Sequence, residues 1–160
     1  MKLRLFAILL VLPAVVLAVP DTCMTEQELL ANVASGFLFA QEISAQLCDP
    51  LMDPMAGRAG GPMVRLQRQI EAKFSAEFAH HSEIRAKYFQ RLYENNWEEK
   101  MARVIREYGA VFLSTLTLGK SECKRLLTEL EIRLDSPWAY IQAKLDYSAK
   151  QSRGRVNLCK

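Results

Sequence analysis

The sequence FSAEFAHHSEIR, residues 74–85, lies at the centre of the longest helical periodicity in the chain, which runs from residue 63 to residue 118. Placing successive residues 100° apart puts the apolar side chains of residues 66–92 on one face about 120° wide. The apolar side chains of residues 97–112 fall about half a turn away from that face. One straight helix cannot bury both faces against the same core, so we expect a break at Asn95 and Asn96, which tolerate left-handed backbone and cap helices.

The break predicts two antiparallel helices, residues 63–94 and 97–118, with one long kinked helix as the alternative. An earlier helix is expected to start at the capping box formed by Thr25 and Glu28. We expect it to end near Cys48, because a residue that precedes a proline disfavours the helical conformation. Residues 49–62 are rich in proline, glycine and methionine and are expected to form a loop.

The C-terminal third of the chain predicts two shorter helices. Gly119 is a helix stop, and Ser121 is placed to cap a helix that reaches Asp135. Pro137 suits the first position of a last helix, which is followed by a polar tail, residues 152–160. No segment alternates with a period of two long enough to form a strand. The sequence therefore predicts an all-α fold, an antiparallel helical bundle of about five helices.

The first residues are typical of a signal peptide. Lys2 and Arg4 precede an unbroken apolar run, residues 5–17, and the small residues Val16 and Ala18 predict cleavage after Ala18. The run is shorter than the roughly 20 residues that a membrane-spanning helix needs. We therefore expect residues 1–18 to be removed, with an uncleaved anchor as the alternative.

The mature chain, residues 19–160, is expected to form one domain without a transmembrane helix, either periplasmic or secreted. The full chain has 21 basic and 18 acidic residues, and two of the basic ones lie in the leader, so the mature charge is nearly balanced. It contains no basic block and no interleaving of aromatic and basic residues. Nucleic acid is therefore an unexpected partner.

The four cysteines of the mature chain predict two disulfides, because an even number in an exported protein is typical of paired cysteines. An intact first helix would separate Cys23 from Cys48 by about 37 Å, far beyond the reach of a disulfide. Two connectivities remain. In an up-down bundle Cys48 and Cys123 lie at the same end, which favours Cys48–Cys123 with Cys23–Cys159. The alternative is Cys48–Cys159 with Cys23–Cys123.

Polar residues interrupt the apolar face of residues 63–94 at one place. Glu77, His81 and Arg85 follow each other at steps of four in the middle of that face, whereas His80 and Glu83 point away from it. A carboxylate, an imidazole and a guanidinium on a buried face need partners. They form either a structural ladder, in which Glu77 pairs with His81 or Arg85, or a ligand-binding site.

A metal site and a catalytic site have weaker support. Glu77 and His80 have the Glu-x-x-His spacing of di-metal bundles, but those sites need two such motifs, and the chain has only two histidines, which are adjacent. A mononuclear site at Glu77 and His81 would need further ligands, of which Glu42 is one candidate. No nucleophile elbow or other catalytic motif is present. We therefore expect no metal, no cofactor and no catalytic residue.

The chain resembles no family whose function could be transferred to it. We expect a small exported helical protein that acts by binding, in a protein-interaction or cell-envelope role, rather than an enzyme. The first alternative is a bundle that binds a metal or a small apolar ligand at the Glu77, His81 and Arg85 face. A hydrolase with an unrecognised site is the third hypothesis.

Overall fold

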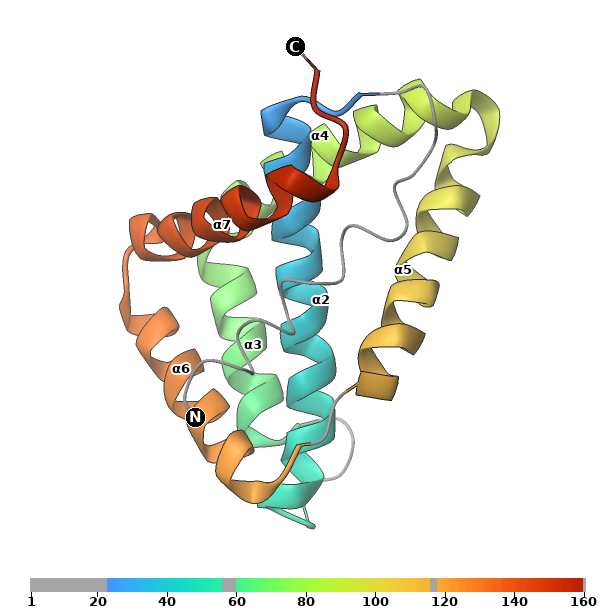
Figure 1. The fold of residues 1–160 in the computed structure, drawn as a ribbon. Helices are drawn as coiled ribbons and strands as arrows, with labels where there is room; N and C mark the ends of the chain where they lie inside the picture. The colour runs from blue at the N-terminus through green and yellow to red at the C-terminus, as the bar shows by residue number, and fades with distance from the viewer. Residues whose placement is uncertain (1–22, 56–59, 116–117, 160) are drawn as a thin grey trace.

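The computed structural model describes residues 23–55, 60–115 and 118–159, and within residues 108–117 it describes no side chains. Figure 1 shows an all-α antiparallel bundle around one long central helix, as the sequence predicts. The described α-helices are α2 (Glu26–Met52), α3 (Pro62–Lys73), α4 (Ser75–Tyr93), α5 (Trp97–Thr115), α6 (Lys120–Asp135) and α7 (Trp138–Ser152). None of these helices combines the length and the apolar character needed to cross a membrane. The predicted signal peptide lies outside the described residues.

Helix α2 is the centre of the core, because α3, α4, α5, α6 and α7 all pack against it. Figure 1 shows α3 returning alongside α2, α5 standing on the opposite side, and α4 and α7 crossing near the N-terminal end of α2. The fully buried apolar side chains of the described residues come from α2, α3, α4, α6 and α7. They include Leu29, Met63, Ile70, Phe89, Ile141 and Leu145.

Both ends of α2 are held by disulfides, in the connectivity that the sequence favoured. Cys48, in the last turns of α2, pairs with Cys123 in the first turn of α6. Cys23, just before α2, pairs with Cys159 at the end of the chain. The C-terminal tail reaches that end because α7 runs toward it, and Met24 and Leu158 form a short parallel bridge there.

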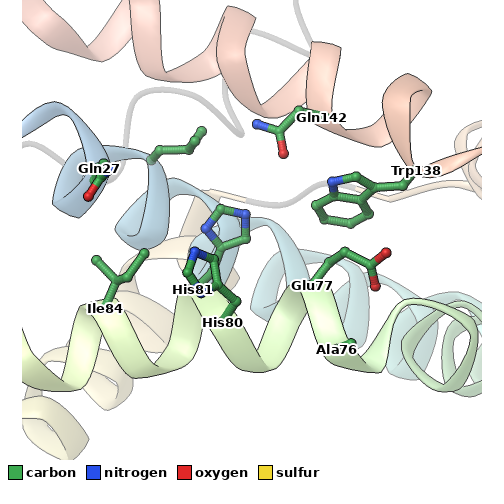
Figure 2. A pocket seen from close by; sticks show the side chains of 9 residues that line it. Gln27, Ala76, Glu77, His80, His81, Ile84, Trp138 and Gln142 are labelled. Carbon is green, nitrogen blue, oxygen red and sulfur yellow. The ribbon is translucent and has the colours of Figure 1, made fainter.

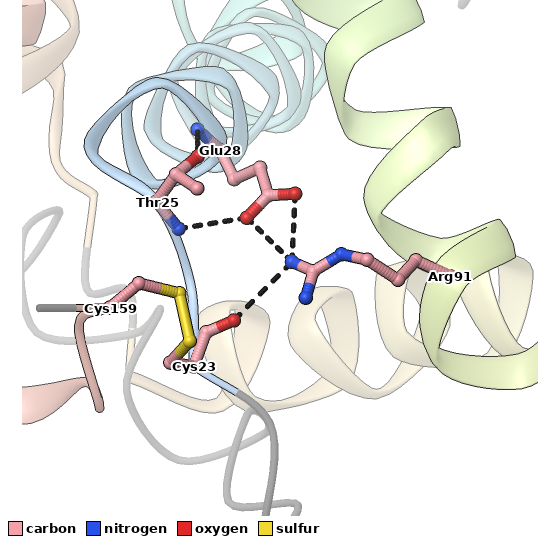
Figure 3. Close-up of a disulfide and its surroundings, with 5 residues drawn as sticks. All are labelled: Cys23, Thr25, Glu28, Arg91 and Cys159. Atoms are coloured by element: carbon pink, nitrogen blue, oxygen red, sulfur yellow. Dashed lines mark hydrogen bonds and ion pairs between the residues drawn. A yellow bond between two sulfur atoms is a disulfide. The ribbon is translucent and has the colours of Figure 1, made fainter.

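The start of α2 confirms the predicted capping box and adds a tertiary contact (Figure 3). The backbone N–H of Thr25 donates to the Glu28 carboxylate at 2.8 Å, and the Thr25 hydroxyl accepts from the N–H of Glu28 at 3.2 Å. The same carboxylate pairs with Arg91 of α4 at 2.8 Å, and Arg91 also donates to the carbonyl of Cys23. Glu28 therefore closes the capping box and also fixes the end of α4 beside the Cys23–Cys159 bridge.

The predicted end of the first helix near Cys48 is wrong. Helix α2 continues to Met52 and contains Pro50 in its last turn. The reason is the buried Asp49, whose carboxylate accepts from the backbone N–H groups of Met63 and Val64 at 2.9 and 3.0 Å. Asp49 thereby supplies an acceptor to the open N-terminus of α3. The predicted loop consequently starts after Met52, and residues 56–59 of it lie outside the described part.

Gly61 is required next to this carboxylate. A Cβ atom at position 61 would overlap the carboxyl group of Asp49. The φ angle of Gly61 is −60°, which any residue can adopt, so it is close approach that selects glycine here. The connection between α2 and α3 therefore depends on the buried carboxylate of Asp49 and on glycine at position 61.

The break between α4 and α5 lies where the apolar face was predicted to shift. Residues Glu94–Asn96 form a short 3-10 turn, and Glu94 has a positive φ of 44°. The predicted helix of residues 63–94 is not continuous, however, because Phe74 separates α3 from α4. Backbone hydrogen bonds still run from Phe74 to Ile70 and from Phe78 to Phe74. The helix therefore bends at Phe74 although helical hydrogen bonds are made on both sides of this residue. No proline or glycine lies at the bend.

We predict that Asp49→Ala lowers the free energy of unfolding by about 2–4 kcal/mol, because two buried N–H groups lose a charged acceptor. Urea unfolding followed by circular dichroism measures this change. Asp53→Ala is the matched control, since Asp53 is exposed and, among the described residues, its carboxylate accepts from the N–H of Met55. Equal losses in the two variants would show that Asp49 does not cap α3.

Candidate functional site

A groove of about 500 Å³ lies between the first turns of α2, the first half of α4 and the start of α7. Figure 2 shows Trp138 and Gln142 reaching from α7 toward the side chains of α4. The residues that line the groove are Gln27, Leu30, Ala76, Glu77, His80, His81, Ile84, Trp138 and Gln142. Three helices that are distant in sequence therefore meet at the polar row predicted on the face of α4.

Trp138 forms one wall of the groove and packs against aromatic side chains of the core. Its ring lies 5.3 Å from that of Phe78 in an edge-on contact and 5.5 Å from that of Phe74. Both phenylalanines are buried, so the indole rests on the core while it remains half-exposed. The kink at Phe74 thus contributes to the site, because Phe74 and Phe78 contact the same indole.

His81 lies deepest among the polar residues of the groove. Its side chain is only 7% exposed, and its ring centroid is 6.1 Å from that of Trp138. Its Nδ1 atom is buried and has no hydrogen-bond partner among the described residues. A buried polar atom without a partner costs free energy, so this nitrogen lowers the stability of the fold.

The surroundings of His81 favour the neutral imidazole. Burial lowers the pKa of His81 below its usual value of 6.5, and the neighbouring His80 lowers it further, whereas Asp146 of α7 opposes this change. Neutral histidine offers one donor and one acceptor nitrogen. At neutral pH the ring can therefore accept a hydrogen bond, in addition to its contact with Trp138.

Glu77 and Arg85, the other two predicted site residues, differ in their surroundings. Glu77 is half-buried and lines the groove, and no described residue pairs with its carboxylate. Arg85 does not line the groove; its Nε donates to Asn32 at 3.2 Å and its guanidinium lies over the ring of Phe89. The structure therefore brings Glu77 and His81 together at the groove and directs Arg85 to the neighbouring part of α2.

His80 and Glu77 both differ in their surroundings from what the sequence predicts. His80 was expected to point away from this face, but it also lines the groove, and its ring lies 6.0 Å from that of His81. The expected ladder of Glu77 with His81 or Arg85 is not formed among the described residues, because neither Glu77 nor His81 has a hydrogen bond or ion pair there. Within the described part of the chain, the Glu77 carboxylate and the His81 imidazole therefore line an open groove without a hydrogen bond or ion pair.

Sequence reasoning missed the contribution of α7. Neither Trp138 nor Gln142 was singled out in the sequence as a site residue. The tertiary placement of α7 across α4 brings them to the site, and no local pattern encodes that placement.

A second cluster of charges lies between α2, α6 and α7, and it is satisfied internally. Arg133 is buried, pairs with Glu129 at 3.2 Å and lies over the ring of Phe37 at 4.6 Å. Lys144 also pairs with Glu129, at 2.7 Å. These ion pairs and the contact with Phe37 are those of a structural ion-pair network.

The groove presents one carboxylate, two imidazoles, two side-chain amides and an indole, together with apolar side chains. In the described part of the chain, no three histidine, cysteine, aspartate or glutamate side chains are placed to hold a metal ion. The lining residues include no serine, threonine, cysteine or lysine. Glu42, a possible further ligand in the sequence interpretation, does not line the groove.

Comparison with known proteins gives no relative for this arrangement. No family model matches the chain, and neither does any curated protein or any solved structure. The function must therefore be inferred from the groove itself.

We predict that His81 makes stability depend on pH. Because the folded state lowers the pKa of His81, the unfolded state binds more protons just below pH 6.5, and stability falls as the pH decreases through this range. His81→Leu removes both this proton uptake and the unpaired Nδ1. Unfolding free energies at pH 7.5 and 5 are therefore expected to differ less in this variant, with equal or higher stability at pH 7.5.

His80→Gln is the control for this measurement, because His80 is exposed and its removal leaves the burial of His81 unchanged. This variant should retain most of the pH dependence of the wild-type protein. The assignment to His81 is contradicted if His81→Leu and wild type lose the same stability between pH 7.5 and 5.

Proposed function

We propose that this chain is a small exported helical protein that acts by binding, and that the groove between α2, α4 and α7 is its ligand site. The observation that carries the proposal is the groove itself, in which the Glu77 carboxylate has no partner among the described residues and lies on the same helix as the deeply placed His81. A partly buried carboxylate is favourable when it has a partner. A ligand that occupies the groove would supply such a partner to Glu77.

Two properties support export. The leader-like residues 1–18 have the composition of a signal peptide. Both cysteine pairs of the mature region are at disulfide geometry, and paired cysteines are typical of oxidising compartments. We propose a periplasmic or secreted location on these grounds.

Binding is favoured over hydrolysis by the composition of the groove. Its walls combine apolar side chains with a few polar groups at separate positions, which is the usual character of a ligand site. The four cysteines are committed to disulfides, so no thiol is available as a nucleophile. A metal-binding function lacks a cluster of ligands in the described residues.

A second candidate is a protein-interaction role through the C-terminal end of α2. Leu47 and Leu51, one turn apart on this helix, are 39% and 37% exposed, and Met55 just beyond it is 92% exposed. Large apolar side chains gathered at one end of a helix are typical of a contact with another protein. This candidate concerns the end of α2 that is opposite to the groove.

The proposal predicts that small molecules bind in the groove of the oxidised protein, recovered after export and expected to begin at Val19. A screen of a chemically diverse fragment library by ¹H–¹⁵N NMR should give compounds that shift the indole N–H of Trp138 and the ring signals of His81. Ala76→Phe should abolish these shifts, because Ala76 is an exposed residue that lines the groove.

Ala79→Phe is the matched control, since Ala79 is equally exposed on the same helix but does not line the groove. Compounds should bind to this variant as they do to wild type. Binding that survives Ala76→Phe, or a library without a single groove binder, would contradict the proposal. A partner captured by wild type but lost in the double variant Leu47→Ser and Leu51→Ser would favour the second candidate.

A further inference from the structure

We propose that the ligand of the groove is a small organic cation, an ammonium group carried by an elongated apolar body. This inference rests on the proposed function, because it names the chemical class of the ligand for the same groove. It is drawn from the charge of the lining residues, the position of Trp138 and the length of the groove along α4.

The charge of the groove is negative at neutral pH. Glu77 contributes a carboxylate to the lining, and among the described lining residues there is no lysine or arginine. Asp146 of α7 adds negative charge near His81. A carboxylate in a partly desolvated site binds a cation by a charge-assisted hydrogen bond and repels an anion.

The nearby cations of the protein have contacts elsewhere. Arg85 interacts with Asn32 and Phe89, on the side of α4 that follows Ile84. Lys73 donates to the carbonyls of Leu134 and Ser136 at the end of α6. Among the described residues, neither of these cations pairs with the Glu77 carboxylate, which leaves it accessible to a positive group that comes from outside the protein.

Trp138 provides a second group that favours cations. The face of an indole attracts an ammonium group more strongly than other aromatic side chains do. Phe74 and Phe78 hold this indole in place, so little conformational entropy is lost when a ligand contacts it. Trp138 and Glu77 line the same end of the groove, which places an aromatic face and a carboxylate together (Figure 2).

The remaining lining residues define the rest of the ligand. Ile84 lies seven residues beyond Glu77 on α4, or about 10 Å along the helix axis, and with Leu30 it offers apolar contact. Gln27 and Gln142 add neutral hydrogen-bonding groups. A volume of about 500 Å³ is that of a small-molecule site. An ammonium near Glu77 joined to a body that reaches Ile84 fits these dimensions.

An anionic ligand is disfavoured by the same residues. It would need a protonated imidazole, and burial of His81 works against protonation. It would also lie beside the Glu77 carboxylate at unfavourable energy. The neutral His81 ring is instead suited to accept one hydrogen bond from an ammonium group.

Three probes that share a phenyl group and differ in charge test the inference: 2-phenylethylamine, 2-phenylethanol and 3-phenylpropanoate. The chain has two tryptophans, so Trp97→Phe leaves Trp138 as the only indole reporter of the groove. Fluorescence titration of this protein at pH 7.5 should show the amine binding at least about tenfold more tightly than the alcohol, as expected for a charged hydrogen bond. The carboxylate should bind most weakly.

Glu77→Gln in the same background should reduce the preference for the amine over the alcohol to less than about threefold. Glu83→Gln is the matched control, because Glu83 is an exposed glutamate of α4 that pairs with Lys87 and does not line the groove. It should leave the preference unchanged.

The inference is overturned if the alcohol or the carboxylate binds as tightly as the amine, or if Glu77→Gln keeps the tenfold preference. In those cases the groove still binds ligands and the proposed function stands. If none of the three probes binds, the inference is also overturned, and the fragment screen with Ala76→Phe decides the proposed function separately.

Discussion

The arrangement of the helices depends on two disulfides, one at each end of α2. Cys48–Cys123 holds the beginning of α6 at the C-terminal end of α2, and Cys23–Cys159 holds the end of the chain at its N-terminal end. The segment between Cys123 and Cys159 must therefore return along α2. It does so as α6 and α7, and α7 consequently crosses α4 near the start of α2 (Figure 1). The groove exists because of this crossing.

The main features of the fold could be predicted from the sequence because they follow from helical periodicity and simple distances. The shift of the apolar face at Asn95 and Asn96 locates the turn between α4 and α5, and the length of α2 excludes a Cys23–Cys48 bridge. The kink at Phe74 could not be predicted, because no proline or glycine marks it in the sequence. The backbone hydrogen bonds on both sides of Phe74 are those of a helix. The extension of α2 through Pro50 depends on the contact of Asp49 with α3, which is tertiary.

The site could be predicted only in part, for the same reason. Glu77 and His81 line the groove because they lie on the apolar face of their own helix, and their role in binding stays a prediction. Arg85 lies on that face too, but it meets Asn32 of α2. Trp138, which completes the groove, comes from a helix more than fifty residues later in the chain. His80 reaches the groove because the site is wider than the apolar stripe from which the prediction was made.

The groove depends on the position of α7, which lies across α4 so that Trp138 closes the groove beside His81. Nuclear Overhauser measurements on the oxidised protein test it directly, because two histidines and two tryptophans give signals that are readily assigned. The account predicts cross-peaks from the indole protons of Trp138 to the ring protons of both His81 and Phe78. An indole of Trp138 that shows contacts to neither ring, in a protein that retains both disulfides, would contradict it.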